Sequence, residues 1–424
     1  MTGKKRILSP LPVLDEKSLL SFFQENDIKD IHAKTVWNFI INNPNSSFDD
    51  LPSTVPDRLG TLLKEKFSFC TSSILEEQVS SDGTVKLLVG LQDGQNVEAV
   101  IITHEGRRTL CVSSQIGCAM GCTFCATGTM GIIGDLMAGE ILEQLWHARR
   151  WGPIRNIVFM GMGEPLNNYD AVLSAIQAMS DVQRFQIAPS YITLSTVGVI
   201  PRMLQLTKEA PYVHLALSLH APNQDLREEI VPSARAFPLD KLMAALDTHL
   251  ESKKKKSGPK VLIEYVLLKD VNDSLELAHQ LGNLLQGRDV IVNLIPYNST
   301  SVEEDYQPPS KEATEVFRST VATYGLITTV RINFGTDIAG ACGQLAIKQK
   351  QGKASDKDIE DLFTTANLGK NGKNKSNKEV AKIKSKIKTR KAESHMYNDY
   401  AIIALSIWLV VLVLILIYVN FINL

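Results

Sequence analysis

The sequence predicts an α/β fold, in which a partial (β/α) barrel follows a small N-terminal helical domain and a β extension, and a C-terminal transmembrane helix ends the chain. Three observations predict this fold. Apolar runs typical of buried strands recur between helical patterns in the middle of the chain. The residues before about 70 show helical periodicity, and the last 24 residues carry no charge.

The helical domain is predicted at 1–72. Its helices are indicated by apolar patterns at helical spacing, separated by short polar breaks, at 18–23, 33–41 and 55–63. The period then changes to two, and residues 84–91 and 97–104 are typical of strands, the first opened by the turn signal Asp82-Gly83. These strands form a predicted β extension at 73–107 that leads into the barrel.

The barrel is predicted at 108–348. A strand at 108–114 leads into a cysteine-rich loop, and further strand-like runs follow at 154–160, 191–197, 213–219, 261–268, 290–295 and 328–333. Helical patterns such as 139–151 and 239–249 lie between them. In β/α barrels the working residues gather at the C-terminal ends of the strands. Residues 161–165, 195–198 and 218–221 occupy such ends.

Composition and charge limit the setting. The 424 residues are 44% hydrophobic, which is ample for a large core. Six cysteines, four of them between Cys111 and Cys125, and a polar N-terminus indicate a reducing, cytoplasmic environment. Residues 1–345 carry 31 Lys and Arg against 39 Asp and Glu. Bulk charge therefore gives no support to nucleic-acid binding by this part, and RNA contact there requires a local basic patch.

The chain changes character after about Gln349. Residues 349–399 are predicted to be a basic flexible linker, since 370–391 hold ten Lys or Arg and one acidic residue. The uncharged stretch within 400–424 is long enough for a transmembrane helix, although a buried core helix is the alternative. Lysines precede it, so the positive-inside rule keeps the body cytoplasmic, anchored to the cytoplasmic face of the membrane. The same lysines can contact rRNA or anionic lipid, or simply form a solvated linker.

The loop Cys118-Ala-Met-Gly-Cys122-Thr-Phe-Cys125 has CxxxCxxC spacing. Three thiolates from one loop can hold three irons of a [4Fe-4S] cluster and leave the fourth open. An open iron can chelate the amino and carboxylate groups of S-adenosylmethionine and reduce its sulfonium, which yields a 5′-deoxyadenosyl radical. The alternative is structural zinc, but such sites use four protein ligands, and no second CxxC pair follows this loop.

The segment from Cys111 through the cysteine loop to Gly128 resembles the RlmN/Cfr family of radical S-adenosylmethionine RNA methyltransferases, over about residues 15–347. The likeness is greatest to its adenine-C2 branch. Further motifs follow in the family's order: Gly161-Met-Gly-Glu-Pro165, Leu194-Ser-Thr-Val-Gly198, Ser218-Leu-His-Ala-Pro222, Ile230-Val-Pro232, Leu268-Lys-Asp-Val-Asn-Asp273, Asn293-Leu-Ile-Pro-Tyr-Asn298 and Ala341-Cys-Gly-Gln-Leu345. Each motif is weak alone, and their order makes the resemblance specific.

The resemblance implies methylation of an adenine ring carbon with two S-adenosylmethionine molecules per turnover. One methylates a carrier cysteine, which Cys342 matches, and the other supplies the radical that takes a hydrogen from that methyl group. Cys111 matches the cysteine that releases the product by forming a disulfide with the carrier, and Glu98 matches the base. Without the resemblance, both cysteines would be interpreted as packing residues and Glu98 as an exposed strand glutamate.

The resemblance also implies the residues that contact S-adenosylmethionine. They are Gly163, Glu164, Ser195, Ser218, Leu219, His220 and Asn293, with Cys118, Cys122 and Cys125 on the cluster. The glycines Gly161 and Gly163 allow close approach of the backbone to the ligand, and Glu164 can accept a charge-assisted hydrogen bond from its amino group. Taken singly, a serine at a strand end is more often a turn former, and His220 a hydrogen-bonded core histidine.

The implied partners are 23S rRNA, tRNA and a low-potential electron donor such as flavodoxin. Lys253-Lys-Lys-Lys256 can contact phosphate, although such a run is commonly a solvated loop. The run from Arg331 to Ile338 is less basic than the family's segment before the carrier cysteine, and the C-terminal tail is no part of the family pattern. Two alternatives remain open: a C8-methylating enzyme of the Cfr type, and a membrane-tethered, non-catalytic metal-binding RNA module.

Overall fold

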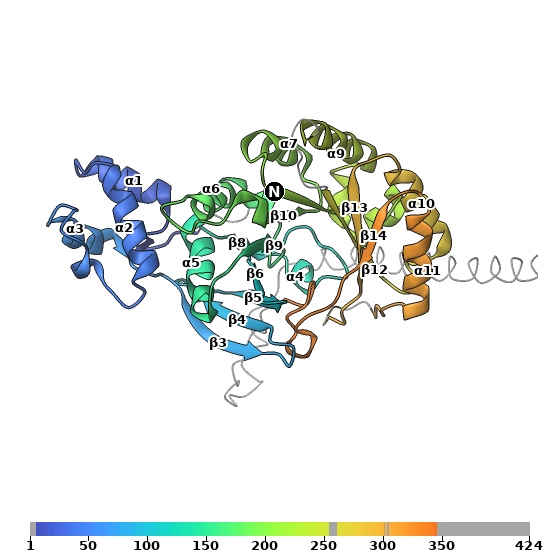
Figure 1. Cartoon of the computed structure of the whole chain (residues 1–424), viewed down its shortest axis with the longest axis horizontal. Coiled ribbons are helices and arrows are strands. Elements are labelled where there is room, and N and C mark those ends of the chain that lie inside the picture. Colours follow the sequence, from blue (N-terminus) through green and yellow to red (C-terminus); the bar gives the residue numbers. More distant parts are fainter. Residues whose placement is uncertain (1–5, 254–260, 301, 303–304, 346–424) are drawn as a thin grey trace, which may run out of the picture. The chain divides into compact units, whose positions relative to one another are not determined.

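The computed structural model describes residues 6–253, 261–300, 302 and 305–345, all of which belong to one compact unit, Met1–Gln349 (Figure 1). The predicted linker at 349–399 and the predicted transmembrane helix at 400–424 lie outside the described residues. Over the described ranges, none of the helices combines the length and the apolar character needed to cross a membrane.

Three helices form the N-terminal part: α1 (Glu16–Glu25), α2 (Ile31–Asn42) and α3 (Leu59–Lys66). Helix α1 begins where the side chain of Asp15 accepts a hydrogen bond from the amide of Ser18, which satisfies a free donor of the first turn. The indole of Trp37 donates to the carbonyl of Val13 at 2.9 Å, so α2 is fastened to the chain that precedes α1. Short strands β1 (Leu11–Pro12) and β2 (Phe67–Ser68) pair in parallel and join the two ends of this part. The predicted helical pattern is confirmed.

A ten-stranded sheet organises the rest, in the order β14-β13-β12-β11-β10-β9-β6-β5-β4-β3. Its strands are β3 (Ser73–Val79), β4 (Val85–Gly90), β5 (Asn96–His104), β6 (Arg107–Cys111), β9 (Asn156–Phe159), β10 (Ile192–Thr196), β11 (His214–Ser218), β12 (Val261–Leu267), β13 (Val290–Pro296) and β14 (Ile327–Val330). Strands β6 and β9 to β14 pair in parallel, whereas β3 to β6 pair as antiparallel neighbours. The sheet has two free ends, so the predicted partial barrel with a β extension is confirmed.

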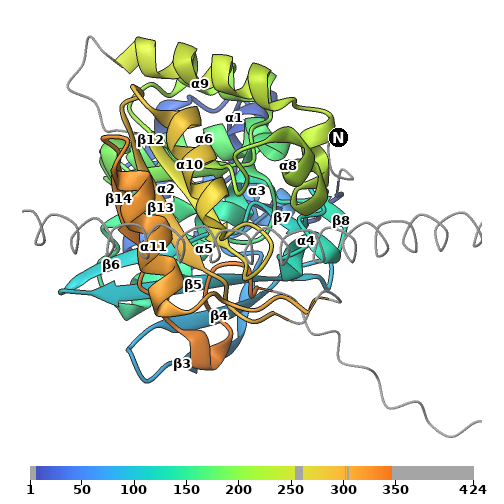
Figure 2. The ribbon, with the colours of Figure 1, turned by 90° about the vertical axis from the view of Figure 1, so that its right-hand side faces the viewer.

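Helices between the parallel strands cover the barrel. They are α5 (Ala138–Ala148), α6 (Tyr169–Ser180), α7 (Ile200–Glu209), α8 (Gln224–Ile230), α9 (Leu239–Lys253), α10 (Leu275–Leu285) and α11 (Lys311–Ala322). Helices α10 and α11 lie side by side outside strands β12 to β14 (Figures 1 and 2). Between β6 and α5, the short strands β7 (Gln115–Gly117) and β8 (Ile132–Asp135) enclose the cysteine loop and the single-turn helix α4 (Ala126–Thr129).

The segment that follows β14 is fastened to the β extension. The amide of Gly335 donates to Asp82 at 2.7 Å, and the hydroxyl of Ser80 donates to Asp337 at 2.5 Å. Gly335 has φ +64°, and an added Cβ would come within 2.8 Å of Thr84, so glycine is required at this contact. The turn between β3 and β4 therefore holds the chain on its way to Cys342.

Helix α9 carries a buried histidine that makes stability depend on pH. The Thr207 hydroxyl donates to the carbonyl of Met203, so its oxygen accepts from Nδ1 of neutral His249 at 2.7 Å. Burial, aided by the charge of Lys253, lowers the pKa of His249 from 6.5 to about 4. The unfolded chain therefore binds this proton first as the pH falls. The contribution of neutral His249 is complete above pH 6.5 and is lost as the pH falls toward 4.

We expect this single histidine to remove about 2 kcal/mol of unfolding free energy between pH 7.5 and pH 5. Urea unfolding at the two pH values measures the loss. His249→Gln should reduce the pH-dependent difference by about that amount. An equal difference in wild type and His249→Gln would contradict this explanation.

Candidate active site

One large cavity lies at the C-terminal ends of the parallel strands. It encloses about 910 Å³, including space open to solvent, a size suited to a cofactor. Its wall is formed by the cysteine loop, by residues at or just beyond the ends of β9, β10, β11, β13 and β14, by Glu264 and Val266 of β12, and by Cys342. Residues that the sequence predicts at these strand ends, within 161–165, 195–198 and 218–221, lie in this wall.

All three cysteines of the loop line this cavity. The loop is fixed by backbone hydrogen bonds from Cys118 to Gly131 at 2.9 Å and from Thr123 to Ile230 at 3.1 Å. Burial raises the pKa of Cys118 to about 12, and burial followed by repulsion from the other two thiols raises the pKa of Cys122 well above 9.0. A bound iron would convert such thiols to thiolates, because a coordinating metal deprotonates them.

The cysteine loop fits an iron–sulfur cluster by its donors. Over the described ranges, no three His, Cys, Asp or Glu side chains are grouped so that they could hold a metal ion. A [4Fe-4S] cluster needs a different arrangement, because each thiolate binds its own iron and the ligands lie around the cluster. The three thiols of the loop line one cavity, which suits this arrangement.

Glu164 occupies the floor of the same cavity. Its two carboxylate oxygens accept hydrogen bonds from the amides of Leu166 and Val197, both at 3.0 Å. Burial raises the pKa of Glu164 to about 6, although these hydrogen bonds lower it. The carboxylate is thus held rigidly, and a cationic ligand in the cavity would favour its ionised form.

Ser195, Ser218 and His220 also line the cavity, as the sequence predicts. The hydroxyls of the two serines lie 3.1 Å apart. Nδ1 of His220 accepts from the amide of Val266 at 3.1 Å, which leaves the proton of the neutral ring on Nε2. Burial lowers the pKa of His220 to about 3. Its φ of +60° is unusual for a residue with a side chain and marks a constrained backbone at the strand end.

Gly161 and Gly163 lie in the loop after β9, and packing explains why both are glycine. The sequence had suggested instead that they let the backbone approach a ligand. An added Cβ at Gly161 would lie 2.6 Å from the carbonyl oxygen of Val112, and one at Gly163 would lie 2.6 Å from the side chain of Gln115. Gly163 also has φ +102°. Contact with residues 112–115, which precede the cysteine loop, therefore already requires glycine at both positions.

A second, smaller cavity adjoins the first, since Met160, Arg331 and Cys342 line both, and it encloses about 380 Å³, including space open to solvent. Cys111 lies on the wall of the second cavity only. The segment around Cys342 is held by a hydrogen bond from Asn298 to the carbonyl of Cys342 at 3.2 Å and by one from Ala126 to the carbonyl of Gly343 at 2.9 Å. The structure thus brings together two cysteines that are far apart in the sequence.

Three predicted site residues lie away from both cavity walls. Leu219 is fully buried, and its backbone donates to Glu264 and accepts from Arg227. Asn293 donates to the carboxylate of Glu264 at 2.9 Å and so reaches the cavity only through that residue. Glu98 pairs with Lys86 at 3.3 Å and is 6% exposed, so the interpretation of an exposed strand glutamate is wrong.

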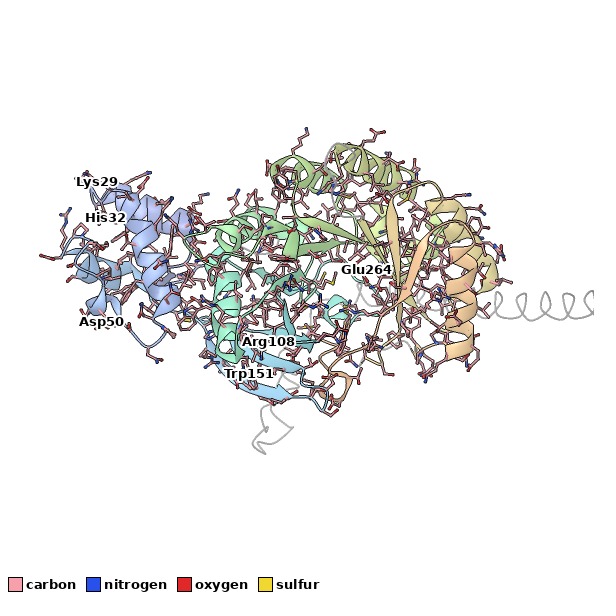
Figure 3. All side chains as sticks on the ribbon, in the orientation of Figure 1. Lys29, His32, Asp50, Arg108, Trp151 and Glu264 are labelled. Carbon is pink, nitrogen blue, oxygen red and sulfur yellow. The ribbon has the colours of Figure 1, made fainter. Side chains whose placement is uncertain are left out.

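The sequence reasoning missed Glu264 and Arg331, which line the first cavity. Glu264 lies on β12 among the parallel strands (Figure 3). Burial raises the pKa of Glu264, and the charge of Arg331 opposes this. The pKa of Arg331 is raised, chiefly by the charge of Cys342 and then by those of Glu264 and Cys111. For Glu264, the only sequence signal was that a single Glu stands within the apolar run 261–268.

Fold and site together define a radical S-adenosylmethionine protein, and residues 112–281 match the family model described as Radical SAM superfamily. The Dual-specificity RNA methyltransferase RlmN 1 of Myxococcus xanthus is 41% identical over 320 residues, which cover 74% of this chain and 88% of that protein. The Dual-specificity RNA methyltransferase RlmN of Alcanivorax borkumensis is 39% identical and covers 86% of this chain and 96% of its own length. The chain belongs to the RlmN family of RNA methyltransferases.

A solved structure agrees with this assignment. The crystal structure of a radical SAM methyltransferase from Sphaerobacter thermophilus is 35% identical, covers 79% of this chain and 99% of its own, and superposes with a TM-score of 0.73. Membership of the family makes the chain a radical S-adenosylmethionine enzyme with a [4Fe-4S] cluster. The alternative of a non-catalytic zinc module is therefore wrong.

Proposed function

We propose that the chain transfers a methyl group to C2 of adenine in 23S rRNA, at the adenosine of the peptidyl-transferase centre, and in tRNA, at the adenosine next to the anticodon. The observation that carries this proposal is the shared wall of the two cavities. Cys342 lines the first cavity together with the cysteine loop, and it lines the second cavity together with Cys111. The names of the relatives supply the RNA substrate and its dual specificity.

The first cavity is the proposed site of radical formation. When bound, the cluster and S-adenosylmethionine supply a 5′-deoxyadenosyl radical. Cys118, Cys122 and Cys125 would hold the cluster, and Glu164 would hold the amino group of the cofactor by a charge-assisted hydrogen bond. Gly163, Ser195, Ser218, Leu219, His220 and Asn293 are the other proposed contacts. Since Leu219 and Asn293 lie behind the wall, they would act through backbone position and through Glu264.

Cys342 is proposed to carry the methyl group as a thioether. Its sulfur would take the methyl group of one S-adenosylmethionine, and removal of a hydrogen from that methyl group would consume a second, so each turnover would use two molecules. When the carbon bonds to the adenine ring, the adduct must give up one electron, for which the oxidised cluster would be the acceptor, and Glu98 would take the ring proton. The Cys111 thiolate would then attack the sulfur of Cys342, which forms a disulfide and breaks the bond from sulfur to carbon, and the released carbon takes a proton to become the methyl group. Reduction of that disulfide prepares the next turnover.

Several organisational features belong to the same proposal. The proposed domains are 1–72, 73–107, 108–348, the linker 349–399 and a membrane helix at 400–424. The catalytic body would lie in the cytoplasm, anchored to the cytoplasmic face of the membrane, with a flavodoxin-like protein as electron donor. The composition of residues 349–424 supports the anchor.

The purified, anaerobically reconstituted enzyme tests the proposed function. It should methylate both a 23S rRNA fragment and tRNA, and digestion should release 2-methyladenosine from each. 8-Methyladenosine would assign the chain to C8 chemistry of the Cfr type. No methylated adenosine in either RNA would contradict the proposal.

Glu164→Gln is expected to weaken S-adenosylmethionine binding about 10- to 100-fold, because a neutral amide replaces the charged acceptor of the ammonium group. Equilibrium dialysis with the reconstituted enzyme measures the affinity. Glu312→Gln on the exposed start of α11 is the matched control and should bind as wild type does. Wild-type affinity in Glu164→Gln would remove Glu164 from the cofactor site.

The anchor predicts that the full chain sediments with membrane vesicles and that a chain shortened to end at Gln349 stays in the supernatant. The uncharged stretch provides apolar area that the shortened chain lacks. A salt wash separates insertion from attraction of the lysines to anionic lipid, since only the latter is screened. A full chain that remains in the supernatant would contradict the anchor.

A further inference from the structure

Two rings lie together at the outer end of the second cavity. His104, the last residue of β5, and Phe334, in the segment after β14, have ring centroids 5.4 Å apart and an interplanar angle of 56°. Phe334 lines the second cavity, whose wall also holds Cys111 and Cys342. The side chain of His104 is 53% exposed. The ring pair therefore joins the cavity of the two cysteines to the protein surface.

Strand geometry places His104 on the face of the sheet that carries the proposed chemistry. Alternate residues of a strand share a face, so Glu98, Ile102 and His104 of β5 point to one side. Cys111 pairs with Val100, which belongs to the same set. Ile102 lines the second cavity, and His104 follows about 7 Å farther along the strand. One continuous face thus runs from Glu98 past the cavity to the ring pair.

The ring pair rests on a rigid support. Phe334 directly precedes Gly335, whose amide is bound to Asp82 at 2.7 Å. His104 pairs with Arg107 of β6 at the end of β5, whereas the pairing of β5 with β4 ends at Ile101. The backbone at each ring is thus held by hydrogen bonds on one side, which reduces the ordering cost of binding a flat partner.

We propose that the His104–Phe334 ring pair stacks a base of the RNA substrate that neighbours the target adenosine. This inference rests on the proposed function, since it needs the target adenosine close to Cys111 and Cys342. Single-stranded RNA is recognised largely by stacking of unpaired bases on aromatic side chains, His included. The surrounding surface suits a base, because Ile332, two residues before Phe334, is 65% exposed and Arg107 pairs with His104 across the strands.

The test measures binding of an RNA hairpin that carries the target adenosine in its loop to the reconstituted enzyme. Two further hairpins each lack one base, on the 5′ side of that adenosine in one and on the 3′ side in the other. Wild type should lose about tenfold in affinity for one of the two abasic hairpins. Phe334→Leu and His104→Ala should bind the intact hairpin about tenfold more weakly and show no further loss on that abasic hairpin.

Two controls keep the test specific. Phe334→Trp retains a ring and should retain affinity, whereas Phe334→Leu retains only apolar bulk. Tyr212→Ala removes an exposed aromatic side chain from another part of the molecule and should bind as wild type does. The stacking site would be overturned if Phe334→Leu bound the intact hairpin with wild-type affinity. It would also be overturned if the loss caused by Phe334→Leu and the loss caused by the missing base were additive. Failure of wild type to methylate the intact hairpin would instead contradict the proposed function.

Discussion

Cys342→Ala is expected to abolish RNA methylation, by at least about 10³-fold, while the iron and sulfide content of the protein stays at the wild-type level. The thiol is the proposed carrier of the methyl group, so no bond between enzyme and adenine can form without it. Cys342 shares a cavity with the cysteine loop but is absent from the CxxxCxxC motif. Nucleoside mass spectrometry of treated tRNA measures the product, and metal and sulfide analysis measures the cluster.

Cys70→Ala is the matched control for this variant. Cys70 lies outside both cavities, and its sulfur contacts Ser72 and His147 at the junction of β2, β3 and α5. Burial raises the pKa of this thiol strongly, as it also does for Cys111, so the position of Cys70 outside the cavities, and not its pKa, makes it the control. Cys70→Ala should methylate RNA at the wild-type rate. Methylation by Cys342→Ala would show that the methyl group does not pass through this residue.

Cys122→Ala is expected to lose the cluster and, with it, every reaction that needs the radical. Each loop thiol would hold one iron, and the open iron must be the one that binds S-adenosylmethionine. Anaerobically purified Cys122→Ala should contain little iron and sulfide and should form no 5′-deoxyadenosine from S-adenosylmethionine. Zinc without sulfide in the wild-type protein would contradict the cluster itself.

The parts of the site that depend on local spacing could be predicted from the sequence alone. The CxxxCxxC loop indicated a cluster, and the apolar runs placed the strand ends that line the cavity. Both signals come from residues that lie close together in the sequence, so they can be recognised without the fold. The order of elements then predicted a parallel barrel with an extension, as the sheet order confirms.

Features that depend on distant segments could not be derived from pattern. Cys111 and Cys342 share a cavity because β6 and the segment after β14 meet, and only the family resemblance had linked them. Burial of Glu98 follows from pairing of β5 with β4, which composition does not reveal. The hydrogen bond from Asn293 to Glu264 depends on the register of two parallel strands.

Isotope labelling tests the central claim most directly, that the methyl carbon reaches adenine through a cysteine-bound methyl group from which hydrogen is removed. The reconstituted enzyme is supplied with S-adenosylmethionine carrying a fully deuterated methyl group, and the product nucleoside is analysed by mass. The carrier route predicts 2-methyladenosine that retains two of the three deuterium atoms, with the third recovered in 5′-deoxyadenosine. A methyl group that arrives with all three deuterium atoms would mean direct transfer and would contradict the proposed roles of Cys342 and Cys111.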